Sequence, residues 1–138
     1  MCEDLQALTL ADSSVDVFVT QDVFEHIPDP EAAWREIARV LAPGGVHVWT
    51  VPIFAGRATL QRARPDGHGG VELLLEADFH GNPIGNGASL VIHEWGEDVV
   101  SRADRAGGTV TERFNTASRL RGVRGEMLDV LVTRRGPR

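Results

Sequence analysis

The sequence predicts an α/β fold in a single domain of 138 residues. Two runs rich in β-branched residues, 15–20 and 46–51, flank a helical pattern that begins at Pro30, which is the order of a parallel strand–helix–strand unit. Two further apolar runs, 109–114 and 127–133, are expected to close the sheet with an antiparallel strand. Because 42% of the residues are hydrophobic, the chain can bury a core, and a wholly disordered chain is excluded.

The first strand and the helix have clear local signals. The strand Val15 to Thr20 is apolar at nearly every position, which indicates that both of its faces are covered. Asp29 can cap the free N–H groups of the helix, and Pro30 suits the first helical position. The turn Pro43-Gly44-Gly45 is expected to end the helix. Apolar residues at helical spacing define one buried face, namely Trp34, Ile37, Ala38 and Leu41.

Residues 53–94 form a long excursion that holds seven of the fifteen glycines. We expect little regular structure there beyond a hairpin or a short helix. A loop of this length in a compact domain is usually functional or disordered, so the excursion is a possible substrate-side region of the single domain 1–138. A second helix is expected over residues 97–106, ending at Gly107-Gly108.

Composition limits the classes of partner. Residues 1–56 hold nine acidic residues and only two arginines. The six arginines of residues 119–138 alternate with strand residues and acids, so we expect no nucleic-acid partner. No run of about 18 apolar residues and no secretory signal is visible, so no membrane partner and a cytoplasmic location are expected. The single Cys2 excludes a disulfide framework.

Common catalytic and binding motifs are missing. No glycine cluster lies between a strand and a helix as a phosphate-binding loop requires, and no nucleophile elbow is present. The five histidines lack the i, i+4 spacing of a helical zinc site, so the sequence does not support a metal site.

Several short segments together carry a family resemblance. The early segments are Glu3-Asp4-Leu5, Asp12-Ser13-Ser14-Val15-Asp16, Gln21 to Pro30 and Pro43-Gly44-Gly45. The later segments are His80-Gly81-Asn82-Pro83 and Trp95-Gly96-Glu97-Asp98. Each segment alone is weak, but their combination resembles the class I S-adenosylmethionine-dependent methyltransferases, in particular the type 11 group.

The resemblance implies that S-adenosylmethionine is the cofactor and assigns four residues to it. Asp4 would accept a hydrogen bond from the adenine amino group, and Leu5 would pack on the ring. Asp22 and Val23 would lie along the methionine portion, outside the carboxyl end of a strand. The alternatives are that Asp4 is a solvated residue near the terminus and that Asp22 is only a turn residue.

The resemblance also implies an acceptor end of the site. Glu25 and His26 would lie where the methyl group meets its acceptor, with His26 as the general base for a hydroxyl nucleophile. Alternatively, both side chains only bond the backbone of the following helix. His80 and Asn82 are the candidate substrate-binding residues of the excursion, although His80 could instead cap a turn.

The family fold sets expectations about the sheet. A seven-stranded sheet with six helices needs roughly 170 residues or more, and no glycine-rich loop after a first strand is present. The chain is therefore expected to be the carboxyl-terminal part of the fold, with strands four, five, seven and six in that order. The sheet would be Rossmann-like, mostly parallel with an antiparallel closing strand. The outer edge of residues 15–20 would then be unpaired, which favours association with another copy or with a missing amino-terminal half.

The function that the sequence predicts is methyl transfer from S-adenosylmethionine to a small-molecule acceptor. The alternative is a catalytically inactive methyltransferase-like module for binding or dimerisation.

Overall fold

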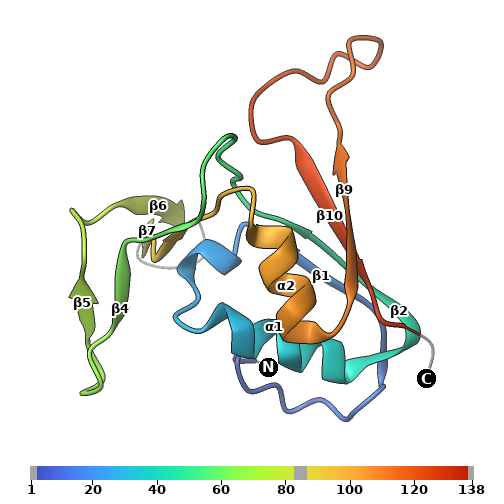
Figure 1. Cartoon of the computed structure of the whole chain (residues 1–138), viewed down its shortest axis with the longest axis horizontal. Helices are drawn as coiled ribbons and strands as arrows, with labels where there is room; N and C mark the ends of the chain where they lie inside the picture. Colours follow the sequence, from blue (N-terminus) through green and yellow to red (C-terminus); the bar gives the residue numbers. More distant parts are fainter. Residues whose placement is uncertain (1–2, 83–86, 137–138) are drawn as a thin grey trace.

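The computed structural model describes residues 3–82 and 87–136, and its centre is a four-stranded sheet (Figure 1). The strands are β1 (Val15–Gln21), β2 (Leu41–Thr50), β9 (Val110–Asn115) and β10 (Asp129–Arg134). They lie in the order β1-β2-β10-β9, which is the predicted order. The α/β class is confirmed.

The expected antiparallel closing strand is present as β10, but the expectation of a mostly parallel sheet is wrong when the hydrogen-bonded strand pairs are compared. Within the described residues, β1 and β2 are the one parallel pair of this sheet, whereas β10 runs antiparallel to both β2 and β9. The physical reason lies in the connections. Helix α1 (Pro30–Val40) provides a crossover between β1 and β2, but β9 and β10 form a hairpin that adds to β2 directly.

Helix α1 begins as the sequence predicts. Asp29 caps it, because its Oδ1 accepts a hydrogen bond of 2.9 Å from the N–H of Ala32. The end differs from the prediction, since β2 starts at Leu41 and Pro43 to Gly45 form an irregularity inside the strand. Gly45 is required there, because a Cβ atom would lie 2.9 Å from the carbonyl oxygen of Ala42 and 3.0 Å from that of Val15.

Helix α2 (Val99–Gly107) packs beside α1, and both helices lie against the same face of the sheet (Figure 1). The guanidinium of Arg102 links them through an ion pair of 2.6 Å to Glu31. The largest buried side chains gather between helices and sheet, and they include Phe24, Ile37, Leu41, Trp49, Trp95 and Leu131. Neither helix of the described chain has the length and apolarity that a crossing of a lipid bilayer needs.

The opposite face of β1 is open in this chain. Val17 and Val19 are 59% and 65% exposed, although the sequence predicted that both faces of the strand are covered. Their neighbours on β2 are Val46 and Val48, which are only partly buried. Because paired residues share a face, these side chains form a valine face: Val17, Val19, Val46 and Val48. Among the described residues, β1 pairs with β2 alone, so its other edge has no strand partner.

The excursion consists of short two-stranded ribbons. The expected hairpin is present, in fact more than once, and no helix occurs among its described residues. The ribbons are β3 (Leu60–Gln61) with β8 (His93–Glu94), β4 (Ala63–Pro65) with β5 (Val71–Leu73), and β6 (Phe79–Asn82) with β7 (Gly87–Leu90). At its base, the N–H of Phe54 donates to the carbonyl oxygen of Trp95 over 2.8 Å. The segment therefore leaves the sheet and returns to it at adjacent points.

Candidate functional site

The site predicted from the sequence lies at the carboxyl ends of β1 and β2. Asp22 follows β1, and its N–H donates to the carbonyl oxygen of Thr50 at the end of β2 over 3.1 Å. The Thr50 hydroxyl donates to Asp22 Oδ1 over 2.9 Å. Asp22 has a φ of 48°, a left-handed conformation that Asp tolerates better than most residues. Asp22 is therefore a turn residue that also sits at the strand-end position where α/β sheets bind ligands.

A single 3₁₀ turn, η1 (Phe24–His26), comes next and presents two candidate side chains. Phe24 anchors it, because its buried ring stacks on Trp34 with ring centres 5.0 Å apart. The N–H of Ile92 donates to the Glu25 carbonyl oxygen over 2.7 Å, which ties the turn to the excursion. Glu25 and His26 are thus held rigidly relative to both the sheet and the excursion.

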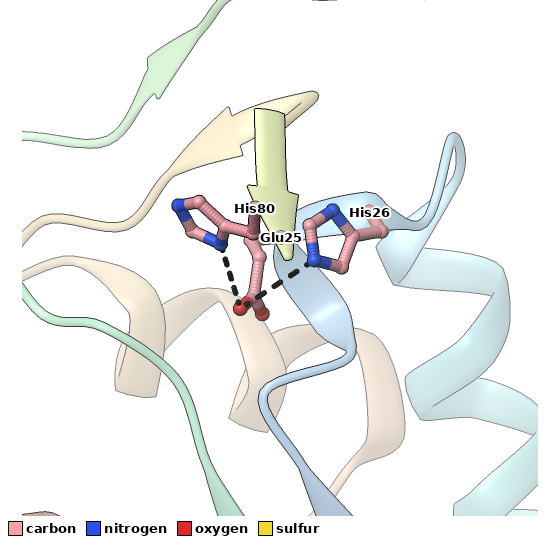
Figure 2. A group of neighbouring side chains, drawn as sticks. All are labelled: Glu25, His26 and His80. Atoms are coloured by element: carbon pink, nitrogen blue, oxygen red, sulfur yellow. Dashed lines mark ion pairs between the residues drawn. The ribbon is translucent and has the colours of Figure 1, made fainter. Parts of the chain in front are cut away.

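The Glu25 carboxylate is buried and has two histidines beside it. Glu25 is 1% exposed, and neither carboxylate oxygen accepts a hydrogen bond from the described residues. His26 Nε2 and His80 Nδ1 lie 3.8 Å and 3.7 Å from Oε1 (Figure 2). Burial raises the pKa of Glu25, and the Asp22 carboxylate raises it further, while the two histidines lower it. Burial therefore disfavours the ionised form of the Glu25 carboxyl, and positive charge beside it favours that form.

The structure brings together Glu25, His26 and His80, three of the residues singled out in the sequence. The two histidine rings are edge-to-face, with centres 5.3 Å apart. The side chain of His26 bonds to the carbonyl oxygen of Leu90 through Nδ1 over 2.8 Å, so its partner lies in the excursion rather than in the following helix. The roles that the sequence assigned to these residues stay predictions.

The other residues predicted from the sequence have different surroundings. Asp4 is exposed, and its Oδ1 accepts hydrogen bonds from the N–H and the side-chain amide of Gln6, which lower the pKa of Asp4. Leu5 and Val23 are partly buried and pack against the core. Asn82 is the last residue of β6, but its side chain lies outside the described residues.

Sequence reasoning missed two partners of the site. Thr50 bonds the Asp22 carboxylate, and its position at the end of the second strand is the signal that could have found it. Leu90 contributes a carbonyl oxygen to His26, and no sequence pattern marks a backbone group.

Comparison with known sequences finds relatives for the first part of the chain. Residues 1–49 match the family model described as a methyltransferase domain. An uncharacterized methyltransferase of Mycobacterium sp. (strain JLS) is 42% identical over 50 residues, which are 36% of this chain and 20% of the relative. An arsenite methyltransferase of Aquipseudomonas alcaligenes is 39% identical over 64 residues, 46% of this chain and 18% of the relative. The matched part is thus about a fifth of the length of these relatives.

Comparison with solved structures covers nearly the whole chain. An S-adenosylmethionine-dependent methyltransferase from Mesorhizobium loti superposes with a TM-score of 0.57 at 18% identity, over 96% of this chain and 67% of that one. The glycopeptide N-methyltransferase MtfA, solved with S-adenosyl-L-homocysteine, gives a TM-score of 0.58 at 18% identity, over 97% of this chain and 59% of that one. At 18% sequence identity, these two superpositions show similarity of fold alone.

Proposed function

We propose that this chain, whose residues 1–49 match the methyltransferase domain model, transfers a methyl group from S-adenosylmethionine to a small-molecule acceptor. The observation that carries the proposal is the strand-end cluster of Asp22, Glu25 and His26, which lies inside the family match. Ligands of open α/β sheets bind outside the carboxyl ends of parallel strands, which is where these side chains lie.

The residues present fit a part of the cofactor. The Asp4 carboxylate is exposed and has more acceptor sites than its two bonds to Gln6 occupy, so it can also accept from an adenine amino group. The Asp22 carboxylate at the strand end suits a cationic sulfonium, and such a cation would in turn favour the ionised form of the buried Glu25. When bound, S-adenosylmethionine would supply an electrophilic methyl group.

The remaining part of the cofactor cradle is not found in this sequence. No strand followed by a glycine-rich loop is present to receive the methionine end. We propose that the unpaired edge of β1 recruits the missing surface, either from another copy or from an amino-terminal half of the fold. In the second case, this chain is the carboxyl-terminal part of a larger fold.

The acceptor end of the proposed site is formed by η1 and the excursion. Positioning supplies most of the acceleration in such a displacement, and the rigid 3₁₀ turn fixes His26 relative to Asp22. With Nδ1 engaged by Leu90, Nε2 of His26 is the nitrogen that can accept a proton from a hydroxyl nucleophile. His80 reaches the same point from β6 and would contact the acceptor.

Calorimetry with S-adenosylhomocysteine tests the cofactor site. We expect binding in the micromolar range that is at least about tenfold weaker in Asp22→Asn, because the charged acceptor at the strand end is lost. Asp16→Asn is the matched control, since Asp16 is an exposed residue of the same strand. Failure of the unmodified chain to bind would remove the enzyme function for this chain by itself.

An inactive binding or dimerisation module is the second candidate. The exposed Val17 and Val19 favour it, because apolar side chains in the middle of a sheet are usually covered. A chain that associates through this strand but does not bind S-adenosylhomocysteine would support the module over the enzyme.

A further inference from the structure

Glu25, His26 and His80 present three donor atoms to one another beside the carboxyl end of β1 (Figure 2). One oxygen of Glu25 and one ring nitrogen of each histidine all lie within 4.8 Å of one another. Both nitrogens face the same oxygen, Oε1, at 3.8 Å and 3.7 Å. These separations are too long for direct hydrogen bonds, but they suit atoms that share an ion.

The hydrogen bond of His26 determines which of its nitrogens carries a proton. A carbonyl oxygen can only accept, so Nδ1 of His26 donates to Leu90, 2.8 Å away. In the neutral ring, Nε2 then holds a lone pair, and Nε2 is the nitrogen that faces Glu25. Two groups that turn lone pairs toward each other are stabilised by a positive charge between them.

The burial of Glu25 is a second reason to expect a positive charge at this point. Its side chain is 1% exposed, and both oxygens lack a hydrogen-bond partner among the described residues. Buried carboxylates in proteins are normally paired, hydrogen-bonded or bound to a metal. Asp22 adds a second negative charge nearby.

We propose that Glu25, His26 and His80 bind a divalent transition-metal cation, with Zn²⁺ the best match to one carboxylate and two imidazoles. Ligand atoms about 2.1 Å from zinc lie about 3.4 Å apart in tetrahedral geometry. The 3.7 Å and 3.8 Å separations from Oε1 lie within a few tenths of an ångström of this value, and the two ring nitrogens, which lie within 4.8 Å of each other, would draw together around the ion.

The surroundings of the cluster agree with a metal site. The Leu90 carbonyl holds the His26 ring in place from behind, as second-layer acceptors do for metal-binding histidines. The His80 side chain is 42% exposed, which gives an ion a path from solvent. Three protein ligands leave a fourth position for water or for an oxygen atom of a ligand. The sequence did not indicate the site, because His80 is far from the other two ligands along the chain.

Metal binding needs neither the cofactor nor the acceptor, so it can be tested separately from the proposed methyl transfer. The two roles of His26 are also exclusive. A His26 that binds a cation through Nε2 has no lone pair left with which to act as a general base.

Titration with Co²⁺, a spectroscopic substitute for Zn²⁺, tests the proposal on the full chain. We expect one equivalent of Co²⁺ to give the visible bands of a four-coordinate ion and to be displaced by Zn²⁺. The variants Glu25→Gln and His80→Ala should bind at least about tenfold more weakly. His68→Ala is the matched control, because His68 is an exposed histidine of the same excursion, and Cys2→Ser excludes a thiol ligand. Both controls should bind as the unmodified chain does.

Circular dichroism would verify that each variant is folded, and His80→Ala is the safest of them because His80 lies on an exposed ribbon. Two outcomes would overturn the proposal. One is the absence of cobalt bands and of any zinc-induced rise in Tm for the unmodified chain. The other is unchanged affinity in both Glu25→Gln and His80→Ala, which would place the ion elsewhere.

Discussion

The imidazole of His47 on β2 and the hydroxyl of Thr20 on β1 form a buried hydrogen bond, with Nε2 and Oγ1 2.9 Å apart. The His47 ring also stacks on Trp49, with ring centres 5.5 Å apart and an interplanar angle of 6°. Burial lowers the pKa of His47 from 6.5 to about 3, because the charged ring would lose its hydration. The pair that joins the two parallel strands is therefore a buried hydroxyl and a neutral imidazole.

This relationship predicts an acid-sensitive fold. The unfolded chain takes up a proton on His47 below pH 6.5, whereas the folded chain resists this until about pH 3. The free energy of unfolding should consequently fall by up to about 1.4 kcal/mol per pH unit in this interval. Urea titrations between pH 7 and pH 4 measure it. His47→Gln should flatten the dependence, while His68→Gln, at an exposed position, should keep it; equal slopes in both variants would contradict the assignment.

Gly96 predicts a large effect of one methyl group. A Cβ atom there would lie 2.2 Å from the carbonyl oxygen of Arg57 and 2.6 Å from the backbone nitrogen of Thr59. Because backbone atoms cannot rotate away, Gly96→Ala should lower the free energy of unfolding by about 3 kcal/mol. Denaturant unfolding measures the change. Gly136→Ala, with open space around it, should change stability by less than about 0.5 kcal/mol, and a similar loss in both variants would refute the steric reason.

The open valine face predicts concentration-dependent association. Val19→Lys should shift the chain toward the monomer, because a charge on an exposed strand opposes both edge pairing and face packing. Size-exclusion chromatography with light scattering measures the molar mass. Val71→Lys is the matched control, since Val71 is 48% exposed but lies on the β4–β5 ribbon. A monomer at high concentration for the unmodified chain would contradict association through β1.

The sequence was most informative where local signals and burial agree. Asp29 and Pro30 predict the start of α1, and the β-branched runs predict β1 and β2, because capping, proline geometry and apolar patterning act over a few residues. The family resemblance predicted that β10 inserts between β2 and β9 as an antiparallel strand. Composition and periodicity alone do not predict this insertion, because it is a tertiary event without a local signal.

The candidate site was predicted in a similarly uneven way. Family resemblance placed Glu25 and His26 together at the acceptor end and offered His80 as a substrate-binding residue, but only folding shows that His80 faces the same carboxylate oxygen as His26. The burial of Glu25 was also invisible in the sequence, since an acidic residue after a strand is usually solvated. The burial follows from the packing of the excursion over η1, through the Ile92 bond to the Glu25 carbonyl.

The backbone hydrogen bond between Phe54 and Trp95 brings the two ends of the excursion together, so the excursion is a closed loop beside the sheet. Insertions, deletions and substitutions at the ends of the ribbons in such a loop leave β2 and α2 in their positions. Residues 55–94 can therefore be exchanged between related chains without changing the sheet. The condition is that Leu90 and Ile92 keep their hydrogen bonds to the 3₁₀ turn.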